Sequence, residues 1–523
     1  MVIWYTLDSG PDQILGAYLV YNLFSYIVSK GGWRQMLQLI STLLMQARPA
    51  GADPSIPRLV DLDPVLVGGP PFRRLFLDAM VVEESHGLER CFHAAEKYEG
   101  NPVFVKERDW EGWGPLCGGT VIRDGDKLRM YYYCIADDEK TKCCVAESED
   151  GLHWTRPIVG DVEWRSSKEN NIITGGTQVI KFAHPESPDR TWVSFHNTGL
   201  QFSADGLHWS EKEPNDGSEL FSSSDVQNYF YDPYNNRIAC TWKCSSRRHR
   251  SCGIVWTEDL KTWVKPVNGP VFTADDLDPD ATQIYGMPVF AYQGMYIGIP
   301  AIYHARWIKY GRYTSPQVMY EAQEGSPRTI DAQIAWTWDF INWTRTPKRE
   351  PFIANSPFHA YDSGMLLVAR APVVMGDELW FYYSAADQIH EDYKGITCSV
   401  ALAKLRIDGF CSMRAGEDEG WFISRREVFN TPKVYINAKC RPGGYVAAEL
   451  LDRHNNVIPG FEWYYSNAFT GDSTRAELTW KTQKFPDSLI DKDKKIRFRI
   501  RNADLFSYLP ADINTEIDDG WPD

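Results

Sequence analysis

The stretch AESEDGLHWTRP, from Ala146 to Pro157, decides the fold because the chain repeats it. A small or acidic residue, an Asp-Gly pair, a tryptophan and a proline are typical of a strand, a tight turn and an aromatic plug. Further copies are SADGLHWSEKEP, TEDLKTWVKP and TWDFINWTRTP, with a degenerate fifth copy, KLRIDGF. The aspartates of the successive copies lie 55, 54, 80 and 69 residues apart: Asp150, Asp205, Asp259, Asp339 and Asp408. This period indicates a solenoid, a propeller or an array.

Each repeat contains runs of residues that favour strands. The first has GGTVIRD (118–124), KLRMYYYCI (127–135) and TKCCVAESED (141–150), with an Asp-Gly turn at Asp124-Gly125. Such runs joined by such turns predict antiparallel hairpins. Three or four short strands in each of five units, without helical periodicity, predict a five-bladed β-propeller. We place this domain at residues 58–416, with its repeats from about residue 101. The repeated tryptophan is expected to pack between neighbouring blades.

Composition and charge narrow the classes of function. The chain has 523 residues, 43% of them hydrophobic, which is enough for more than one domain. The formal charge is 55 − 70 = −15, and the run RRHR (247–250) is the one basic cluster. An acidic chain of this kind is a poor candidate for binding nucleic acid. The eleven cysteines are an odd number without a CxxC pair, so most are expected to be buried thiols. No zinc-type ligand spacing is present.

Residues 1–57 lie outside the repeats and are predicted to be an N-terminal helical or targeting segment. The apolar run Ile14–Ser29 has only 16 residues, which is short for a membrane span. Lys30 and Arg34, then MLQLISTLLM and QARPAGA, follow the order of a signal peptide. Two interpretations stay open: a signal peptide, with secretion, or a pair of amphipathic helices packed on the propeller of a cytoplasmic protein.

The pattern changes after the fifth repeat. Runs such as KVYINAK, GYVAAELLD, AELTWK and KIRFRIRN predict a separate β-sandwich at residues 417–510, followed by an acidic tail at 511–523. The runs 74–84 and 88–93 are expected to supply the outer strand that closes the ring against the last blade. The predicted fold class is therefore all-β: a five-bladed β-propeller followed by a β-sandwich, with a short helical N-terminal segment.

Several motifs together are similar to a known superfamily. They are NPVF before the first unit, GDKLRMYYY, SEDGLHW, and the ending GYVAAELLDRHNNVIPGF … GDSTRAELTW … IRFRIRNADLFSY. Over roughly residues 70–510 the chain resembles the arabinanase/levansucrase/invertase superfamily, glycoside hydrolase families 43 and 32. The resemblance implies a carbohydrate substrate and hydrolysis of glycosidic bonds. It implies no cofactor, and it is compatible with a central structural Ca²⁺.

Glycoside hydrolysis requires two carboxyl groups, one that protonates the leaving oxygen and one that acts as base or nucleophile. In a propeller, the residues just before the innermost strands face a central funnel. Carboxylates at these entrances are our candidate catalytic residues: Asp225 and Asp362 as the acid/base pair, supported by Glu111 and Asp280. The families that the chain resembles have an acid at the entrances of the first three blades. Here the second entrance lacks one, and Asp225 alone occupies a matching place.

Other side chains at the entrances are predicted to bind the sugar. Trp110, Trp113 and Tyr285 offer flat rings that stack on a sugar face. His359 precedes the fifth unit, and Asp331 begins the third strand of the fourth. Three classes of function follow. The first is a glycoside hydrolase, the second a carbohydrate-binding propeller without catalysis, which the missing carboxylate favours. The third is a lyase or a phosphorylase on the same scaffold. A phosphorylase needs a basic phosphate site, for which Arg370 and Arg306 are the candidates.

Overall fold

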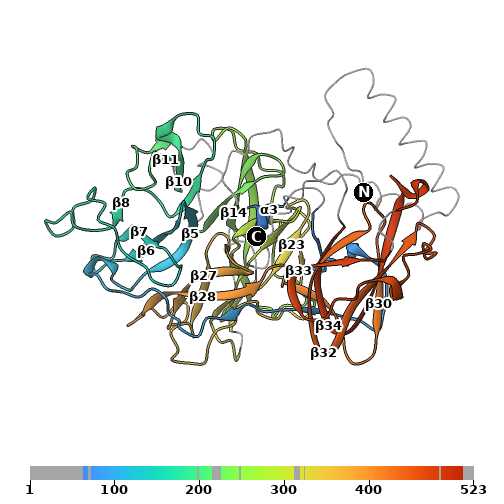
Figure 1. Ribbon diagram of the computed structural model, residues 1–523. Helices are drawn as coiled ribbons and strands as arrows, with labels where there is room; N and C mark the ends of the chain where they lie inside the picture. The colour runs from blue at the N-terminus through green and yellow to red at the C-terminus, as the bar shows by residue number, and fades with distance from the viewer. Residues whose placement is uncertain are drawn as a thin grey trace, which may run out of the picture. The chain divides into compact units, whose positions relative to one another are not determined.

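The computed structural model describes residues 63–68, 72–196, 199–214, 225–246, 249–310, 319–322, 324–481 and 485–510. The predicted N-terminal segment at 1–57 and the acidic tail at 511–523 lie outside these residues. Within them the chain is almost entirely β, with one short α-helix, α3 (Pro64–Val67), and a few 3-10 turns (Figure 1). No helix of this described part has the length and apolar character that a membrane crossing requires.

The repeat units form small antiparallel sheets. The first unit has β5 (Leu116–Asp124), β6 (Lys127–Ile135), β7 (Thr141–Ser148) and β8 (Ile172–Ile173). The second has β9 (Gln178–Lys181), β10 (Trp192–His196), β11 (Gly199–Ser203) and β12 (Glu213–Pro214). The third has β13 (Gln227–Asp232), β14 (Arg237–Ser246) and β15 (His249–Thr257). The fourth has β17 (Val289–Tyr292), β18 (Met295–Gly298), β23 (Ala335–Thr337) and β24 (Thr344–Arg345).

The units follow one another in the manner of propeller blades. β5 contacts β9, β9 contacts β13, and β13 contacts β17. The fifth unit consists of β25 (Met365–Val368), β26 (Val373–Met375), β27 (Glu378–Ala386) and β28 (Cys398–Arg406), of which β25 and β27 contact β5. These four strands share an eight-stranded sheet with β16 (Thr282–Gly286), β19 (Ala301–His304), β22 (Ile330–Ala332) and β4 (Glu96–Lys97). The arrangement is a β-propeller, but the fifth unit has no sheet of its own, so the count of five blades stays a prediction.

The strand at the outer edge of the fifth unit is β4, which pairs with β28. The prediction that residues 74–84 and 88–93 close the ring is wrong. Instead, β2 (Val82–His86) pairs with β30 (Gly420–Ser424), and β3 (Glu89–Phe92) pairs with β29 (Cys411–Ala415). Pairing with these later strands also allows the residues just before β2 to enter the core, where the rings of Phe76 and Phe422 meet at 5.4 Å.

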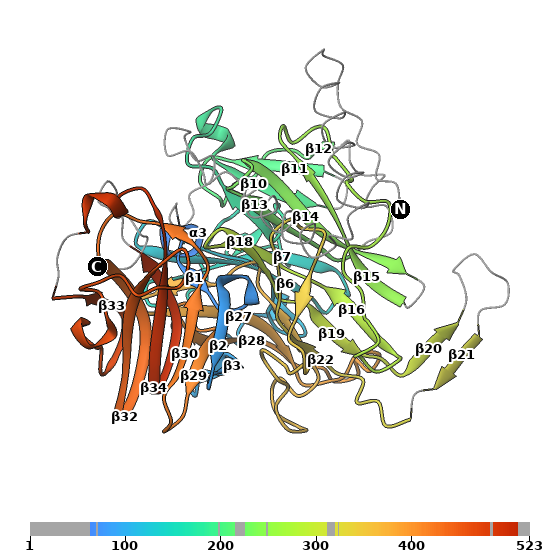
Figure 2. The ribbon, with the colours of Figure 1, turned by 90° about the vertical axis from the view of Figure 1, so that its right-hand side faces the viewer.

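The last part of the chain, together with three strands that precede the repeats, forms one nine-stranded sheet (Figure 2). It comprises β1 (Arg74–Leu75), β2, β3, β29, β30, β31 (Glu427–Val428), β32 (Lys433–Asp452), β33 (Asp472–Thr479) and β34 (Asp493–Pro510). β32 and β34 pair along most of their length, with register shifts near Asn437 and between Cys440 and Tyr445. Because these two long strands run through the whole sheet, the prediction of a β-sandwich is not confirmed and stays a prediction.

The repeated aspartate forms the same turn in four units. In the first, Asp150 Oδ1 accepts hydrogen bonds from the backbone N–H groups of Leu152 and His153, at 2.9 and 2.8 Å. Asp205, Asp259 and Asp339 bind the equivalent N–H groups in the same way. The next residue has a positive φ in each copy: Gly151 (76°), Gly206 (75°), Leu260 (59°) and Phe340 (65°). The aspartate therefore stabilises the turn, as short polar side chains do.

The repeated tryptophans pack between units, as predicted. Trp154 of the first unit meets Tyr382 of the fifth, with ring centroids 5.6 Å apart. Trp209 of the second unit meets Tyr131 of the first at 6.3 Å, in an edge-on geometry that aromatic pairs prefer. In the fourth unit, Trp343 packs on Phe272. The prediction that a large flat ring fills the space between neighbouring units is confirmed at these three positions.

The conformation of the turn supplies a stability prediction. A Cβ atom on Gly206 would lie 2.5 Å from Tyr131 Oη and 2.7 Å from Arg129 Nη1, in addition to the positive φ. We expect Gly206→Ala to lower the free energy of unfolding by about 2–3 kcal/mol, because a left-handed conformation alone costs about 1–2 kcal/mol. The matched control is Gly125→Ala, with φ +61° and no atom within 4 Å of the added Cβ. Equal losses in chemical denaturation would contradict the expected clash.

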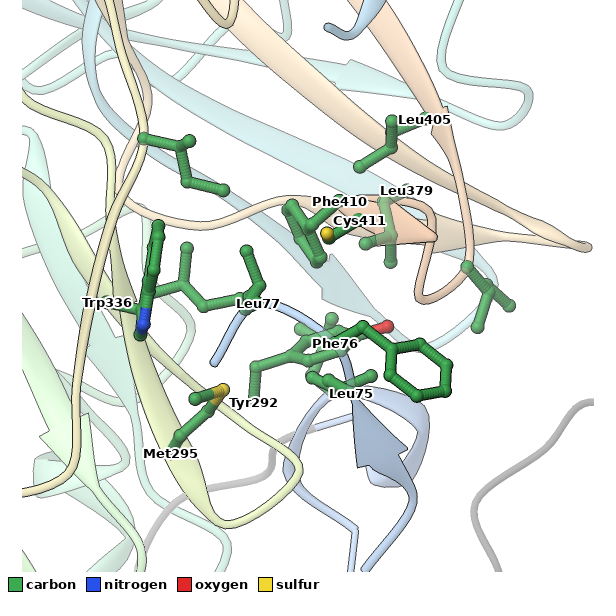
Figure 3. Packing of buried hydrophobic residues seen from close by; sticks show 14 of the residues in the cluster. Leu75, Phe76, Leu77, Tyr292, Met295, Trp336, Leu379, Leu405, Phe410 and Cys411 are labelled. Atoms are coloured by element: carbon green, nitrogen blue, oxygen red, sulfur yellow. The ribbon is translucent and has the colours of Figure 1, made fainter. Parts of the chain in front are cut away.

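The largest hydrophobic core joins the fourth and fifth units to the C-terminal sheet (Figure 3). Leu75, Phe76 and Leu77 enter it from β1 and the turn that follows. They lie among Cys411 of β29 and residues of the repeats: Tyr292, Met295, Trp336, Leu379, Leu405 and Phe410. Burying these large side chains favours a fixed arrangement of the repeats and the sheet, since each contributes about 1.5–3 kcal/mol of transfer free energy.

One buried ion pair lies at the edge of this core. Arg73 Nε donates to Asp408 Oδ2 at 2.8 Å, and both side chains are fully buried. Asp408 also accepts hydrogen bonds from Tyr292 Oη at 2.7 Å and Ser507 Oγ at 2.5 Å. The degenerate fifth copy of the repeat thus uses its aspartate to bind three segments that are distant in the sequence.

Candidate active site

Side chains from four repeat units meet in one polar and aromatic cluster. We call it the polar cluster; its members are Trp113, Asp225, Lys243, Arg250, Tyr285, Tyr303, His390, Glu391 and Tyr393. Trp113 precedes β5, and Asp225 stands just before β13. The next four members lie on β14, β15, β16 and β19, and the last three lie in the loop between β27 and β28. In a β-propeller, a binding site is commonly formed where side chains from several blades meet.

Aromatic rings form much of the polar cluster. The ring of His390 is 4.6 Å from that of Tyr303 and 5.1 Å from that of Tyr285. Tyr393 is 41% exposed and stacks on Trp113, with centroids 5.6 Å apart and an interplanar angle of 21°. An exposed ring of this kind has a face and an edge on which a sugar ring can pack.

Asp225 is an exposed carboxylate of the polar cluster, with 70% of its side chain accessible. It is ion-paired with Lys243, whose Nζ lies 4.6 Å from the centre of the Tyr285 ring. Burial would raise the pKa of Asp225, but the hydrogen bond and the charge of Lys243 outweigh it and lower the pKa. The carboxylate is therefore ionised at neutral pH, as a base or a nucleophile must be.

Glu391 brings a second exposed carboxylate to the polar cluster. Tyr303 Oη donates a hydrogen bond of 2.8 Å to Glu391 Oε1. Glu391 has φ +83°, a conformation that costs a non-glycine residue about 1–3 kcal/mol and that concentrates at functional sites. Burial and the charge of Arg250 lower the pKa of the neighbouring His390, so its imidazole is neutral at pH 7.

A β-bulge determines where Tyr285 points. The register between β16 and β19 shifts between Ile284 and Gly286, so the strand carries one extra residue there. Bulges of this kind re-aim a side chain next to a site. Gly286 is required nearby, because a Cβ there would lie 2.7 Å from Val226 Cγ1.

Asp362 lies in a different environment from Asp225. Its side chain is fully buried and ion-paired with Lys97 Nζ at 2.5 Å. Tyr383 Oη donates to the same oxygen, Oδ2, at 3.1 Å, and Oδ1 is buried without a partner among the described residues. The contacts of Asp362 therefore hold the fifth unit against β4, whereas those of Asp225 belong to the polar cluster.

Glu111 and Asp280 differ from each other. Glu111 is fully buried and accepts hydrogen bonds of 2.8 Å from Arg156 Nε, from Tyr132 Oη and from a backbone N–H. Such a saturated carboxylate stabilises the loop before β5 and has no lone pair directed at a ligand. Asp280 is exposed in the loop before β16. Its neighbour Asp278 is buried against Arg345.

Of the five predicted sugar-binding residues, two belong to the polar cluster: Tyr285 and Trp113. Trp110 instead donates to Asn171 Oδ1 at 3.0 Å and packs on the core of the first unit. His359 is exposed and its ring lies 3.9 Å from that of Phe358. Asp331 bonds to His304 at 2.8 Å and stands opposite Ile302, so it faces away from Tyr303.

Most of the polar cluster was not predicted. Lys243, Tyr303, His390, Glu391 and Tyr393 were not among the sequence candidates. Arg250 was considered only within the run RRHR, for which a solvated hairpin tip was favoured over a site for an anionic sugar. The signal for three of them is the run QIHEDY (388–393) after β27, which combines charged and aromatic residues in a loop. Function concentrates in such loops when a rigid scaffold positions them. Arg250 lies on β15 and its guanidinium is near two tyrosine rings.

Metals and thiols give no further candidate. Within the described ranges, no group of three or more His, Cys, Asp or Glu side chains is arranged to hold a metal ion. The central Ca²⁺ stays a prediction. All eleven cysteines are free thiols and most are buried, as expected. Arg370, a candidate phosphate ligand, is buried, and its Nη1 donates to the carbonyl oxygen of Val179 at 2.6 Å.

A cavity of about 580 Å³ lies between the second and third units, apart from the polar cluster. Its lining includes Phe182, Phe202, Arg190 and Lys261. Arg190 is already paired with Glu213 at 2.9 Å. No residue of the polar cluster and no predicted site residue lines this cavity.

The comparisons with known proteins are as follows. No protein-family model and no curated protein matches the chain. Among solved structures, a glycosyl hydrolase from Bacteroides ovatus has 14% identity and a TM-score of 0.41, covering 60% of this chain and 94% of its own. An α-L-arabinofuranosidase from Podospora anserina, in complex with cellotriose, has 10% identity and a TM-score of 0.40, covering 60% and 97%. The propeller described above rests on the sheets of this chain, not on these similarities.

Proposed function

We propose that the protein is a glycoside hydrolase whose active site is the polar cluster. The observation that carries the proposal is the meeting of two exposed carboxylates, Asp225 and Glu391, with aromatic rings from separate repeat units, of which that of Tyr393 is exposed. Two carboxyl groups are the minimum for acid/base cleavage of a glycosidic bond, and rings hold the sugar beside them. The resemblance of the repeat motifs to families 43 and 32 agrees with this function.

The environments of the two carboxylates suggest their roles. Asp225 is kept ionised by Lys243 and suits the base or nucleophile. Glu391, which accepts a hydrogen bond from Tyr303, is the second carboxylate of the polar cluster and by elimination would supply the proton to the leaving oxygen. The pair Asp225 and Glu391 takes the place of the predicted pair Asp225 and Asp362, since the buried Asp362 is held by Lys97. Glu111 and Asp280 then have no direct part in the reaction.

A carbohydrate-binding propeller without catalysis is the second candidate. Two of the four predicted catalytic carboxylates, Asp362 and Glu111, are fully buried and paired, which favours this alternative. The aromatic members of the polar cluster would bind a sugar equally well in a protein that does not cleave it.

The test is a release assay of the full chain on a panel of aryl glycosides and oligosaccharides. We expect turnover that Asp225→Asn and Glu391→Gln each reduce about 100-fold or more, the usual contribution of a positioned acid or base. Asp126→Asn, an exposed aspartate in the hairpin between β5 and β6, is the charge-matched control and should keep full activity. Sugar binding without release across the panel would favour the binding propeller. Full activity of Asp225→Asn would overturn the assignment.

A further inference from the structure

Arg250 is a cation of the polar cluster whose charge contributes to lowering the pKa of Asp225, but without a close ion pair to it. Its Nη1 donates one hydrogen bond of 2.6 Å, to Gln283 Oε1. In the part of the chain that the structure describes, no carboxylate forms an ion pair with it. The other cation, Lys243, is already paired with Asp225. The guanidinium has five N–H donors in a planar fork, so most of them remain for a ligand.

The position of Arg250 is fixed rather than loose. Its guanidinium carbon lies 5.7 Å from the Tyr285 ring centroid and 5.8 Å from the Tyr303 ring centroid. Gln283, which accepts its hydrogen bond, is buried on β16. Two neighbouring rings and a buried acceptor hold the fork in the polar cluster. A preorganised fork binds an oxyanion with less loss of side-chain entropy than a flexible lysine.

The charge of the chain makes this arrangement informative. The formal charge is −15, so carboxylates are abundant. Most other arginines of the described residues form an ion pair with a carboxylate. In the polar cluster, Lys243 compensates Asp225, and Glu391 is bound by a neutral tyrosine. The two cations of the polar cluster equal its two carboxylates in number, but a neutral sugar would leave the fork of Arg250 without an ion pair. An acidic group on the substrate would complete the pairing.

We propose that Arg250 binds an acidic group on the sugar, so that the site selects anionic glycosides over neutral ones. The group is a planar or tetrahedral oxyanion carried by the carbohydrate: the carboxylate of a uronic acid or a sulfate ester. Both accept two parallel hydrogen bonds from a guanidinium. The proposal rests on the polar cluster being the sugar site, as in the proposed function, but it concerns recognition and does not require cleavage.

The test measures binding by calorimetry with matched pairs of sugars that differ in one group: glucosides and glucuronides, galactosides and galacturonides, galactosides and their sulfate esters. We expect the full chain to bind the acidic member more tightly in at least one pair, and to lose this preference in high salt. Comparison of the uronic acid pairs with the sulfate ester pairs shows whether the preferred acidic group is a carboxylate or a sulfate. Equal or tighter binding of the neutral members throughout, or no binding of any acidic member, overturns the proposal.

Variants of Arg250 locate the preference. Arg250→Gln should weaken binding of the preferred acidic sugar about 10- to 100-fold and weaken binding of its neutral counterpart much less. Arg250→Lys should restore part of the affinity, because it keeps the charge but not the fork. Arg190→Gln, which removes an arginine that is paired at the second unit, is the matched control. A uniform loss for acidic and neutral sugars in Arg250→Gln overturns the proposal, and circular dichroism verifies that each variant is folded.

Two outcomes separate this inference from the proposed function. Selective binding of acidic sugars without any release keeps the role of Arg250 and overturns the hydrolase. Release that requires inorganic phosphate, and that Arg250→Gln abolishes, means that the fork binds phosphate as a co-substrate; this result overturns the acidic sugar and moves the site to the phosphorylase class.

Discussion

Asp408→Asn is expected to lower the free energy of unfolding by about 3–5 kcal/mol, because it leaves the buried guanidinium of Arg73 without a counter-charge. Both side chains have no accessible surface, and Asp408 accepts hydrogen bonds from Arg73, Tyr292 and Ser507. These donors come from the segment before β1, from β17 and from β34. One carboxylate thus holds the chain before the propeller, the fourth unit and the C-terminal sheet together.

The control for Asp408→Asn is a surface pair of the same chemistry. Arg190 and Glu213 are 2.9 Å apart but 30% and 48% exposed. Glu213→Gln should therefore cost less than about 1 kcal/mol, the usual limit for an exposed ion pair. Chemical unfolding followed by tryptophan fluorescence measures both variants. A loss below 1 kcal/mol for Asp408→Asn would show that Arg73 finds another partner or water when the carboxylate is removed.

Lys97→Met is the second substitution with a large expected effect. It leaves the fully buried carboxylate of Asp362 with one hydrogen bond, from Tyr383, and without a charge partner. We expect a loss of about 3 kcal/mol, since removing one partner of a buried pair exposes the desolvation cost of the other. Lys127→Met removes a lysine that is 53% exposed and 3.1 Å from Glu147, and is expected to have little effect on the same unfolding curve.

The same pair decides between two roles for Asp362. If its role is to anchor β4, the double variant Lys97→Met with Asp362→Leu should recover part of the lost stability, because no charge is then left buried. Turnover per folded molecule should then stay near that of the parent chain. A stable double variant that has lost turnover 100-fold would instead restore the predicted catalytic role of Asp362.

Sequence reasoning succeeded where a feature depends on neighbours along the chain. The Asp-Gly-x-x-Trp motif predicted the turns, because the aspartate bonds to N–H groups two and three residues later. It also predicted that Trp154, Trp209 and Trp343 pack against a neighbouring unit, since a repeated blade places each ring in the same space. Of the candidate site, Asp225, Trp113 and Tyr285 were identified from their places before or at the start of the repeat strands.

Other predictions failed or stayed open because one local sequence pattern is compatible with two different structural environments. An aspartate or glutamate before a strand has the same local sequence whether it is exposed, as Asp225 is, or buried and paired, as Glu111 and Asp362 are. The runs 74–84 and 88–93 have strand character, but any free edge can accept them. Their pairing with β30 and β29 depends on which strand edges the tertiary fold brings beside them.

The sequence by itself determined a β-rich chain of repeated units, their turns and the tryptophans between them. These features arise from contacts that recur with the repeat, so one copy predicts the others. Only the tertiary structure decided which charged groups share a site. Residues as distant as Trp113 and Tyr393 meet because the units are arranged around one another. Whether a carboxylate is paired, buried or free then depends on burial and charge contributed by other units, which no single repeat contains.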